Sequence, residues 1–162
     1  MNKLMVRTSS KKSNNKGFSL VELIIVIAIM AVLVAILAPQ LLKYVERSRE
    51  AKDRTVTDEI DRAITIALAD ETTYLATDLS ADFDITVENN GTVLEVDVGG
   101  ATANTALAKE IAAILGVTTT SDTFTIPGTS YSSAKFKDVT VTFTVKYNST
   151  SKAISVSNDI PA

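Results

Sequence analysis

The sequence is 162 residues long with a formal net charge of −3, and 46% of its residues are hydrophobic. This length leaves room for one domain of modest size. His and Cys are absent, which removes most metal sites, thiol chemistry and histidine-based catalysis. We therefore expect a protein that is not an enzyme, holds neither a cofactor nor a metal, and folds on its hydrophobic core without disulfides.

Residues 1–17 form a polar, basic leader. All of its charged residues are cations: Lys3, Arg7, Lys11, Lys12 and Lys16. The overall charge of −3 therefore leaves about −8 for the rest of the chain. An acidic body argues against specific nucleic-acid binding, which needs clustered cations. Cations before a first membrane helix hold that end in the cytoplasm, so the body is expected outside.

An apolar stretch from Leu20 to Leu42 follows the leader, and Glu22 is its one charged residue. As a helix that rises about 1.5 Å per residue, this stretch comes close to the ~30 Å hydrocarbon core of a bilayer. We therefore predict a transmembrane and assembly helix over residues 18–42. An ordinary secretory signal is the alternative, and it would start the mature chain at or beyond Pro39. The length of the run and the carboxylate within it argue against that alternative.

The start of this stretch carries a specific motif, which reads Gly17-Phe18-Ser19-Leu20-Val21-Glu22. Placed between a basic leader and an apolar run, it resembles the signature of type IV prepilins, which pseudopilins of type II secretion and competence systems share. The resemblance implies that a prepilin peptidase cleaves between Gly17 and Phe18, that Phe18 is N-methylated, and that Glu22 pairs with the N-terminus of a neighbouring subunit. It also implies a homo-oligomeric helical filament, drawn out of membrane lipid by an assembly platform in the cytoplasmic membrane. The lack of Cys fits a Gram-positive style of pilin.

Two residues of the apolar stretch bear on assembly through their own chemistry. A carboxylate at the centre of a membrane helix costs about 2.5–3.5 kcal/mol, and less near an interface. Glu22 therefore either pairs with an α-amino group freed at Phe18 or reaches the headgroups with no partner. Pro39 lies inside the helical pattern, where a proline removes a hydrogen bond and crowds the preceding turn. A helix kink is predicted at Pro39.

The fold class predicted for the whole chain is α+β. The long N-terminal helix continues amphipathically over residues 43–70, and a small antiparallel sheet domain, residues 71–162, packs on this second half. An apolar stripe at helical spacing needs a cover that only the strands provide: Val56, Ile60, Ala63, Ile64, Ala67 and Leu68. The charged segment before the stripe is expected to be solvated, with weak pairs at i,i+4: Glu50 with Arg54, and Asp58 with Arg62.

Alternating apolar and polar residues predict the strands of the head. A hairpin is expected over 83–88 and 92–98, around the turn Asn89-Asn90-Gly91. A short helix over 105–115 follows, capped by Asn104 or Thr102 and stopped by Gly116. An edge strand is expected at 123–126, and a final hairpin over 137–147 and 153–157. The connector 71–81 has mixed signals.

Three groups of polar or aromatic residues in the head are weighed as sites. Four acids form a candidate calcium site, but they lack EF-hand spacing and are interpreted as a solvated face: Asp78, Asp82, Asp84 and Glu88. The triplet Asn148-Ser149-Thr150 fits a glycosylation acceptor, although a hairpin turn explains it better. The aromatic side chains are expected to pack in the core or across strands: Tyr131, Phe136 and Tyr147.

The sequence therefore predicts a structural subunit of a type IV pilus, assembled through its N-terminal helix into a surface filament for adhesion, motility or aggregation. Before assembly it would be a single-pass cytoplasmic membrane protein with its N-terminus inside. One alternative is a pseudopilin of a type II secretion or DNA-uptake system. Another is a single-pass, membrane-anchored binding domain that never polymerises.

Overall fold

A computed structural model of the chain describes residues 17–77, 79, 81–99, 104–148, 150–151 and 153–160. The leader cations, Thr102, Asp78 and Ser149 lie outside the described residues. The chain divides into two compact units, residues 1–41 and 42–162. The first described helix, α1 (Leu20–Ala69), belongs to both units, and the sheet lies entirely in the second.

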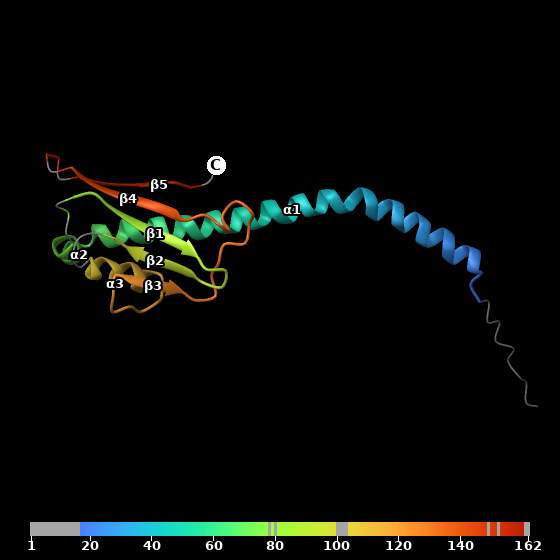
Figure 1. Cartoon of the computed structure of the whole chain (residues 1–162), viewed down its shortest axis with the longest axis horizontal. Coiled ribbons are helices and arrows are strands. Elements are labelled where there is room, and N and C mark those ends of the chain that lie inside the picture. Colours follow the sequence, from blue (N-terminus) through green and yellow to red (C-terminus); the bar gives the residue numbers. More distant parts are fainter. Residues whose placement is uncertain are drawn as a thin grey trace, which may run out of the picture. The chain divides into compact units, whose positions relative to one another are not determined.

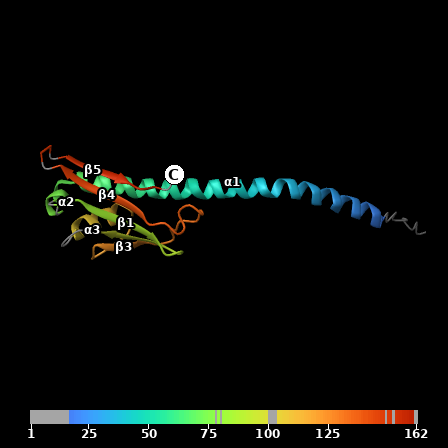
Figure 2. The same cartoon turned by 45° about the horizontal axis from the view of Figure 1, so that its top comes forward.

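The second unit is built on a five-stranded antiparallel sheet (Figures 1 and 2). Its strands are β1 (Phe83–Asn89), β2 (Leu94–Val98), β3 (Thr123–Ile126), β4 (Val141–Asn148) and β5 (Ala153–Asn158), in the spatial order β3-β2-β1-β4-β5. In the three central strands, every second side chain is buried. The α+β fold is therefore confirmed, with β3 and β5 as the edge strands.

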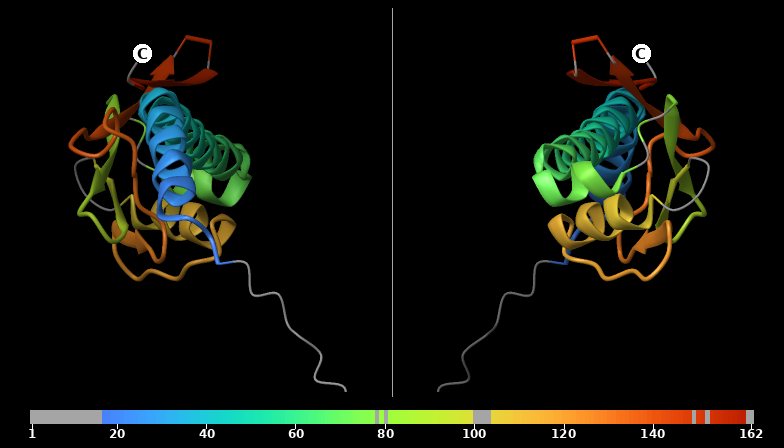
Figure 3. Two further views of the ribbon diagram at one scale, coloured as in Figure 1. Left: turned by 90° about the vertical axis from the view of Figure 1, so that its right-hand side faces the viewer. Right: turned by 90° about the vertical axis from the view of Figure 1, so that its left-hand side faces the viewer.

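The core lies between the inner face of the sheet, the second half of α1, and α3 (Thr105–Ile114). Looking along the helices, Figure 3 shows the strands curving around one side of α3 and the second half of α1. Ile60 and Ile64 of the helix stripe are 1% and 0% exposed, and Val56 is half-buried. The expectation that the strands cover this stripe is confirmed.

The structure settles one segment that the sequence left open and corrects two local predictions. The connector contains a short helix, α2 (Glu71–Ala76), because the carboxylate of Asp70 accepts hydrogen bonds from the backbone N–H groups of Thr72 and Thr73. Asn104 occupies the N-cap position of α3, but its side chain makes no capping hydrogen bond within the described residues and donates to the carbonyl of Gly99. The second strand of the first hairpin begins at Leu94, because Asn89 remains paired within β1.

The last correction concerns the start of β4, which the alternating pattern placed at Lys137. The strand begins at Val141, and the residues before it belong to the connection from β3. In that connection the carbonyl of Ser133 accepts from the N–H groups of Phe136 and Lys137, which forms a tight turn. The Phe136 side chain is completely buried, so the turn is anchored in the core.

Candidate assembly segment and its neighbouring loop

The N-terminal motif ends in a helix cap. Gly17, Phe18 and Ser19 are non-helical, and α1 begins at Leu20. The Glu22 carboxylate reaches back and accepts a hydrogen bond from the backbone N–H of Ser19, at 2.8 Å. A Ser followed three residues later by Glu is the capping-box spacing, which satisfies a backbone donor at the first turn. Glu22 therefore has a partner within its own chain.

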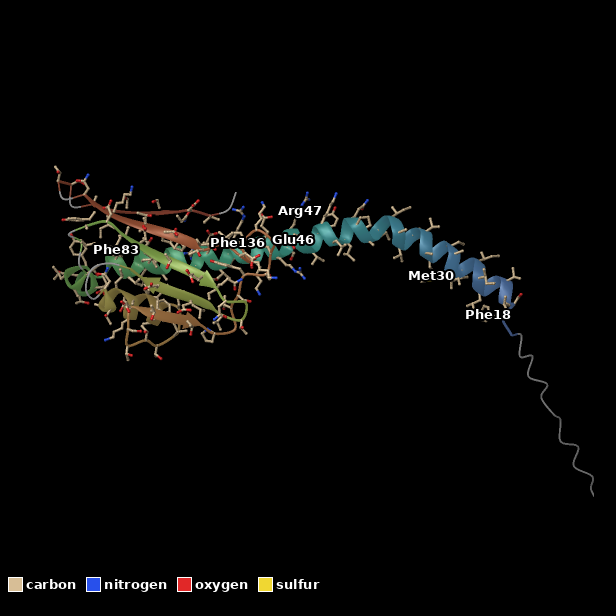
Figure 4. The ribbon with its side chains drawn as sticks, in the orientation of Figure 1. Phe18, Met30, Glu46, Arg47, Phe83 and Phe136 are labelled. Atoms are coloured by element: carbon tan, nitrogen blue, oxygen red, sulfur yellow. The ribbon has the colours of Figure 1, made fainter. Side chains whose placement is uncertain are left out.

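The apolar stretch presents its side chains to the outside. Each large apolar side chain from Leu20 to Leu42 is between 51% and 73% exposed, and side chains project all round the helix between Phe18 and Met30 (Figure 4). By length and composition, α1 is the one helix in the described part of the chain able to cross a membrane. A continuous exposed apolar surface of this kind marks a lipid or protein contact.

Pro39 lies within this helix without ending it. The structure assigns α-helix to every residue from Leu20 to Ala69, Pro39 included. A proline inside a helix lacks the N–H that would donate to the carbonyl four residues earlier. The kink at Pro39 stays a prediction.

Beyond the apolar stretch, a buried carboxylate on α1 holds a loop of the head. Asp53 is completely buried. It accepts hydrogen bonds from the backbone N–H groups of Ser132, at 3.0 and 3.1 Å, and of Ser133, at 2.7 Å. Next to it, the Ser133 hydroxyl is buried and has no hydrogen-bond partner among the described residues. We call residues 131–138 the clamped loop.

Other α1 residues on the same side of the helix hold the clamped loop as well. Glu46 accepts from the backbone N–H of Ala134, and Glu50 pairs with the ammonium of Lys135 at 2.9 Å. Thr57 shares a hydrogen bond of 2.9 Å with the Tyr131 hydroxyl. Positions 46, 50, 53 and 57 alternate spacings of four and three, so they lie along one face of the helix. The expectation of a purely solvated segment is wrong for this face.

Electrostatics and aromatic packing support the same contact. The Lys135 ammonium lowers the pKa of Glu50 below its ordinary value. The Arg54 guanidinium, which lies 3.1 Å from the Glu50 carboxylate, lowers it further. Burial raises the pKa of the Tyr131 phenol. The Tyr131 and Phe136 rings pack with their centroids 5.2 Å apart, and the Arg54 guanidinium lies 5.9 Å from the Phe136 ring centroid.

The structure also bears on the predicted ion pairs, the acidic group and the Asn148 triplet. The pair Glu50–Arg54 forms, whereas Asp58 and Arg62 make no ion pair in the described part of the chain. Within the described residues no cluster of acids has the geometry of a metal site. Asn148 acts as a turn residue, since its side-chain oxygen accepts from the backbone N–H groups of Thr150 and Ser151.

Sequence reasoning missed the clamped loop and the cap at Glu22. The cap has a readable signal, because Ser19 and Glu22 stand at capping-box spacing before an apolar run. The clamped loop has no such signal, since its residues and their hydrogen-bond partners on α1 are 74 or more residues apart. Asn89, expected to form the first hairpin turn, donates from its side chain to the loop carbonyls of Tyr131 and Lys137.

Comparison with known proteins bears on the N-terminal motif. A family model described as the prokaryotic N-terminal methylation motif matches residues 12–38. The chain is 42% identical over 59 residues to the type IV major fimbrial protein FimA of Dichelobacter nodosus, which covers 36% of this chain and 38% of that relative. It is 40% identical over 50 residues to the type IV major pilin protein PilA of Myxococcus xanthus (strain DK1622), which covers 31% of this chain and 23% of that relative.

The chain carries a prokaryotic N-terminal methylation motif, and over its N-terminal third it is similar to type IV pilins. The matched residues 12–38 include Gly17, Phe18 and Glu22, so the resemblance seen in the sequence is confirmed. The chain spans 38% of the length of the FimA protein that it matches. No solved structure matches the chain. The clamped loop lies outside the residues matched by the methylation motif.

Proposed function

We propose that this chain is the precursor of a structural subunit of a type IV pilus, a non-enzymatic homo-oligomeric protein. One observation carries the proposal: a prokaryotic N-terminal methylation motif stands at the start of a helix whose large apolar side chains are exposed from Leu20 to Leu42. In the stored precursor this surface would face membrane lipid. In the filament it would face the same helix of other subunits, so assembly changes the apolar partner without exposing the surface to water.

Processing would create the charge that assembly needs. A prepilin peptidase would hydrolyse the Gly17–Phe18 bond, and the new α-amino group on Phe18 would be N-methylated. Glu22 already accepts from the N–H of Ser19, but a carboxylate has two oxygens and about four lone-pair sites. It can therefore cap its own helix and also accept a neighbour's ammonium. Such a head-to-tail contact does not close on itself, which is the geometry an open filament requires.

The location and partners follow from the same reasoning. The basic leader would hold the N-terminus in the cytoplasm, and the head would lie outside the cytoplasmic membrane until an assembly platform drew the subunit into a surface fibre. A pseudopilin would share every one of these steps but form a short fibre. A membrane-anchored binding domain would keep the leader or the membrane helix and would not polymerise.

The deciding experiment is N-terminal peptide mass spectrometry on fibres sheared from the surface of cells that express the full chain. The proposal predicts an abundant peptide that starts at N-methylated Phe18 in the sheared fraction. The same peptide confined to membranes would indicate a pseudopilin or an unassembled pool. A chain that starts at Met1, or beyond Ala38, would contradict the proposal. Gly17→Leu is a suitable negative control, because it removes the small residue before the expected cut.

A further inference from the structure

The ten residues of α1 that follow Leu42 carry four exposed cations, which we call the cationic belt: Lys43, Arg47, Arg49 and Lys52. At about 100° per residue Lys43 and Arg47 lie on one side of the helix, and Arg49 and Lys52 lie on another. Lys43 is adjacent in sequence to the last residue of the exposed apolar stretch. The belt therefore sits on the helix where an embedded apolar segment would leave the hydrocarbon.

The acids of this part of α1 keep their charge although most of them contact the clamped loop, but residues 43–54 carry five cations against three acids, so the segment stays net positive. Glu46 accepts from the Ala134 N–H, Glu50 pairs with Lys135 and Arg54, and Asp53 is buried against the loop. Arg49 approaches Glu46 only to 3.8 Å, with both side chains largely exposed, and such pairs contribute little. Lys43, Arg47 and Lys52 make no ion pair within the described residues.

We propose that the cationic belt binds the anionic phosphate headgroups of the bilayer that holds the precursor. The proposal rests on the proposed function only in requiring that the apolar helix be stored in a membrane. The headgroup layer is about 5–8 Å thick on each side, and α1 rises about 1.5 Å per residue. Lys43 and Arg47 thus fall within that layer, while Arg49 and Lys52 lie within about one Debye length of it.

The position of the belt makes a chance arrangement a poor explanation. Lys and Arg concentrate on the cytoplasmic flank of membrane helices, yet here a second group stands on the opposite flank from the leader. Juxtamembrane cations gain free energy from anionic lipid surfaces, and the cations of residues 43–54 outnumber the acids. A rival occupant is the outer face of another copy's sheet, where exposed carboxylates stand on β1 and β2: Asp84, Glu88, Glu95 and Asp97.

The test uses the full chain in lipid vesicles, with a fluorophore on Ser48→Cys. Ser48 is exposed and lies between two belt residues, and the native chain has no Cys. Quenching is compared between phosphatidylglycerol and phosphatidylcholine that carry the same headgroup quencher, at equal mole fraction. We expect severalfold stronger quenching by the anionic lipid at low salt, and loss of that preference at about 1 M salt, where the Debye length is ~3 Å.

Two variants, each with four cations replaced by glutamine, distinguish the effect of the belt from the effect of the leader. The belt variant is Lys43→Gln, Arg47→Gln, Arg49→Gln and Lys52→Gln, and it should lose the preference. The matched leader variant is Arg7→Gln, Lys11→Gln, Lys12→Gln and Lys16→Gln, and it should keep the preference, because the leader lies on the other side of the apolar stretch. A label at Thr125→Cys, on an exposed position of β3, should show no preference.

The outcomes are distinct. Equal quenching by both lipids, or a preference that survives in the belt variant, overturns the proposal. Equal lipid quenching together with self-association of the chain that the belt variant loses assigns the belt to a contact with another copy, which also overturns it. Failure of the chain to float with the vesicles contradicts membrane storage and hence the proposed function. If the chain floats with the vesicles but shows no preference for the anionic lipid, only the proposal about the cationic belt is contradicted.

Discussion

At the residue scale, Glu22 has two separable roles, and substitution can distinguish them. Glutamine keeps the capping-box acceptor for the Ser19 N–H but carries no charge. If the charge pairs with the Phe18 amino group of a neighbour, Glu22→Gln and Glu22→Ala should both reduce surface fibres at least about tenfold, a loss of roughly 1.4 kcal/mol per contact. Sheared-fibre yield, normalised to the membrane pool, measures this. Normal assembly of Glu22→Gln with loss in Glu22→Ala would mean that capping alone matters.

Asp53 is the buried residue on which the clamped loop most depends. Asp53→Ala would leave the backbone N–H groups of Ser132 and Ser133 without an acceptor. We expect a loss of about 2–4 kcal/mol in the free energy of unfolding, because buried unsatisfied donors and broken buried charge contacts are costly. Urea denaturation of the full chain in detergent micelles measures it. The control is Asp58→Ala, exposed on the same helix, and equal unfolding free energies for the two variants would contradict the assignment.

The sequence reveals Glu22 and hides Asp53 for a physical reason. The cap at Glu22 is local, so its donor stands three residues away and the apolar run marks it. Asp53 looks like any acid on a charged helix, and only the tertiary fold places the N–H groups of a distant loop against it. Long-range acceptors of this kind leave no periodic pattern in a single sequence.

At the element scale, the ion pair between α1 and the clamped loop has a defined pH dependence. The Lys135 and Arg54 cations lower the folded-state pKa of Glu50 below its ordinary value of 4.5. Because the folded value is the lower one, the stabilisation is complete above the ordinary value and is lost as pH falls through the folded value. The difference in unfolding midpoint between the native chain and Glu50→Gln should therefore be largest near neutral pH and shrink below about pH 4.5.

The matched control for this pH series is Glu59→Gln, since Glu59 is an exposed acid on α1 with no ion pair in the described chain. Its difference from the native chain should be small at every pH. A Glu50→Gln difference that grows as the solution is acidified would contradict the sign of the shift.

The helices and strands that could be predicted from the sequence are those whose residues follow a single periodicity. Alternation predicted β1 and β5 to within a residue, and the i,i+4 stripe predicted the buried face of α1. The pattern from Lys137 also alternates, yet β4 starts at Val141, because Phe136 is fixed in the core and Ser133 closes a turn before it. α2 was missed because six residues are too few for a periodic signal, although Asp70 is a good N-cap.

At the scale of the whole molecule, the division near Leu42 separates two kinds of apolar surface. Before it, the large apolar side chains are exposed, which is the surface that the proposed function assigns to lipid and to other subunits. After it, they converge on one core that runs from the α1 stripe to β5. The buried core residues all lie within the second unit, so we expect this unit to fold without the first.

The last prediction follows from where on α1 the head's contacts begin. A fragment of residues 43–162 keeps the core and every α1 contact to the clamped loop, so it should be soluble, monomeric and folded without detergent. A fragment of residues 59–162 keeps the core stripe from Ile60 but loses the α1 partners of the loop: Glu46, Glu50, Asp53 and Thr57. Hydrogen exchange should then be fast at residues 131–138 and still slow in β1 and β4.

The comparison isolates the loop because both fragments retain the whole sheet and α3. Phe136 would lose the Arg54 guanidinium from its ring and Tyr131 its Thr57 partner, which lowers the cost of opening the loop. Equal protection of the loop in the two fragments would mean that Asn89 and the buried Phe136 hold it unaided. Fast exchange throughout the shorter fragment would instead show that the head needs the α1–loop contacts to fold, because the sheet would then be unprotected as well as the loop.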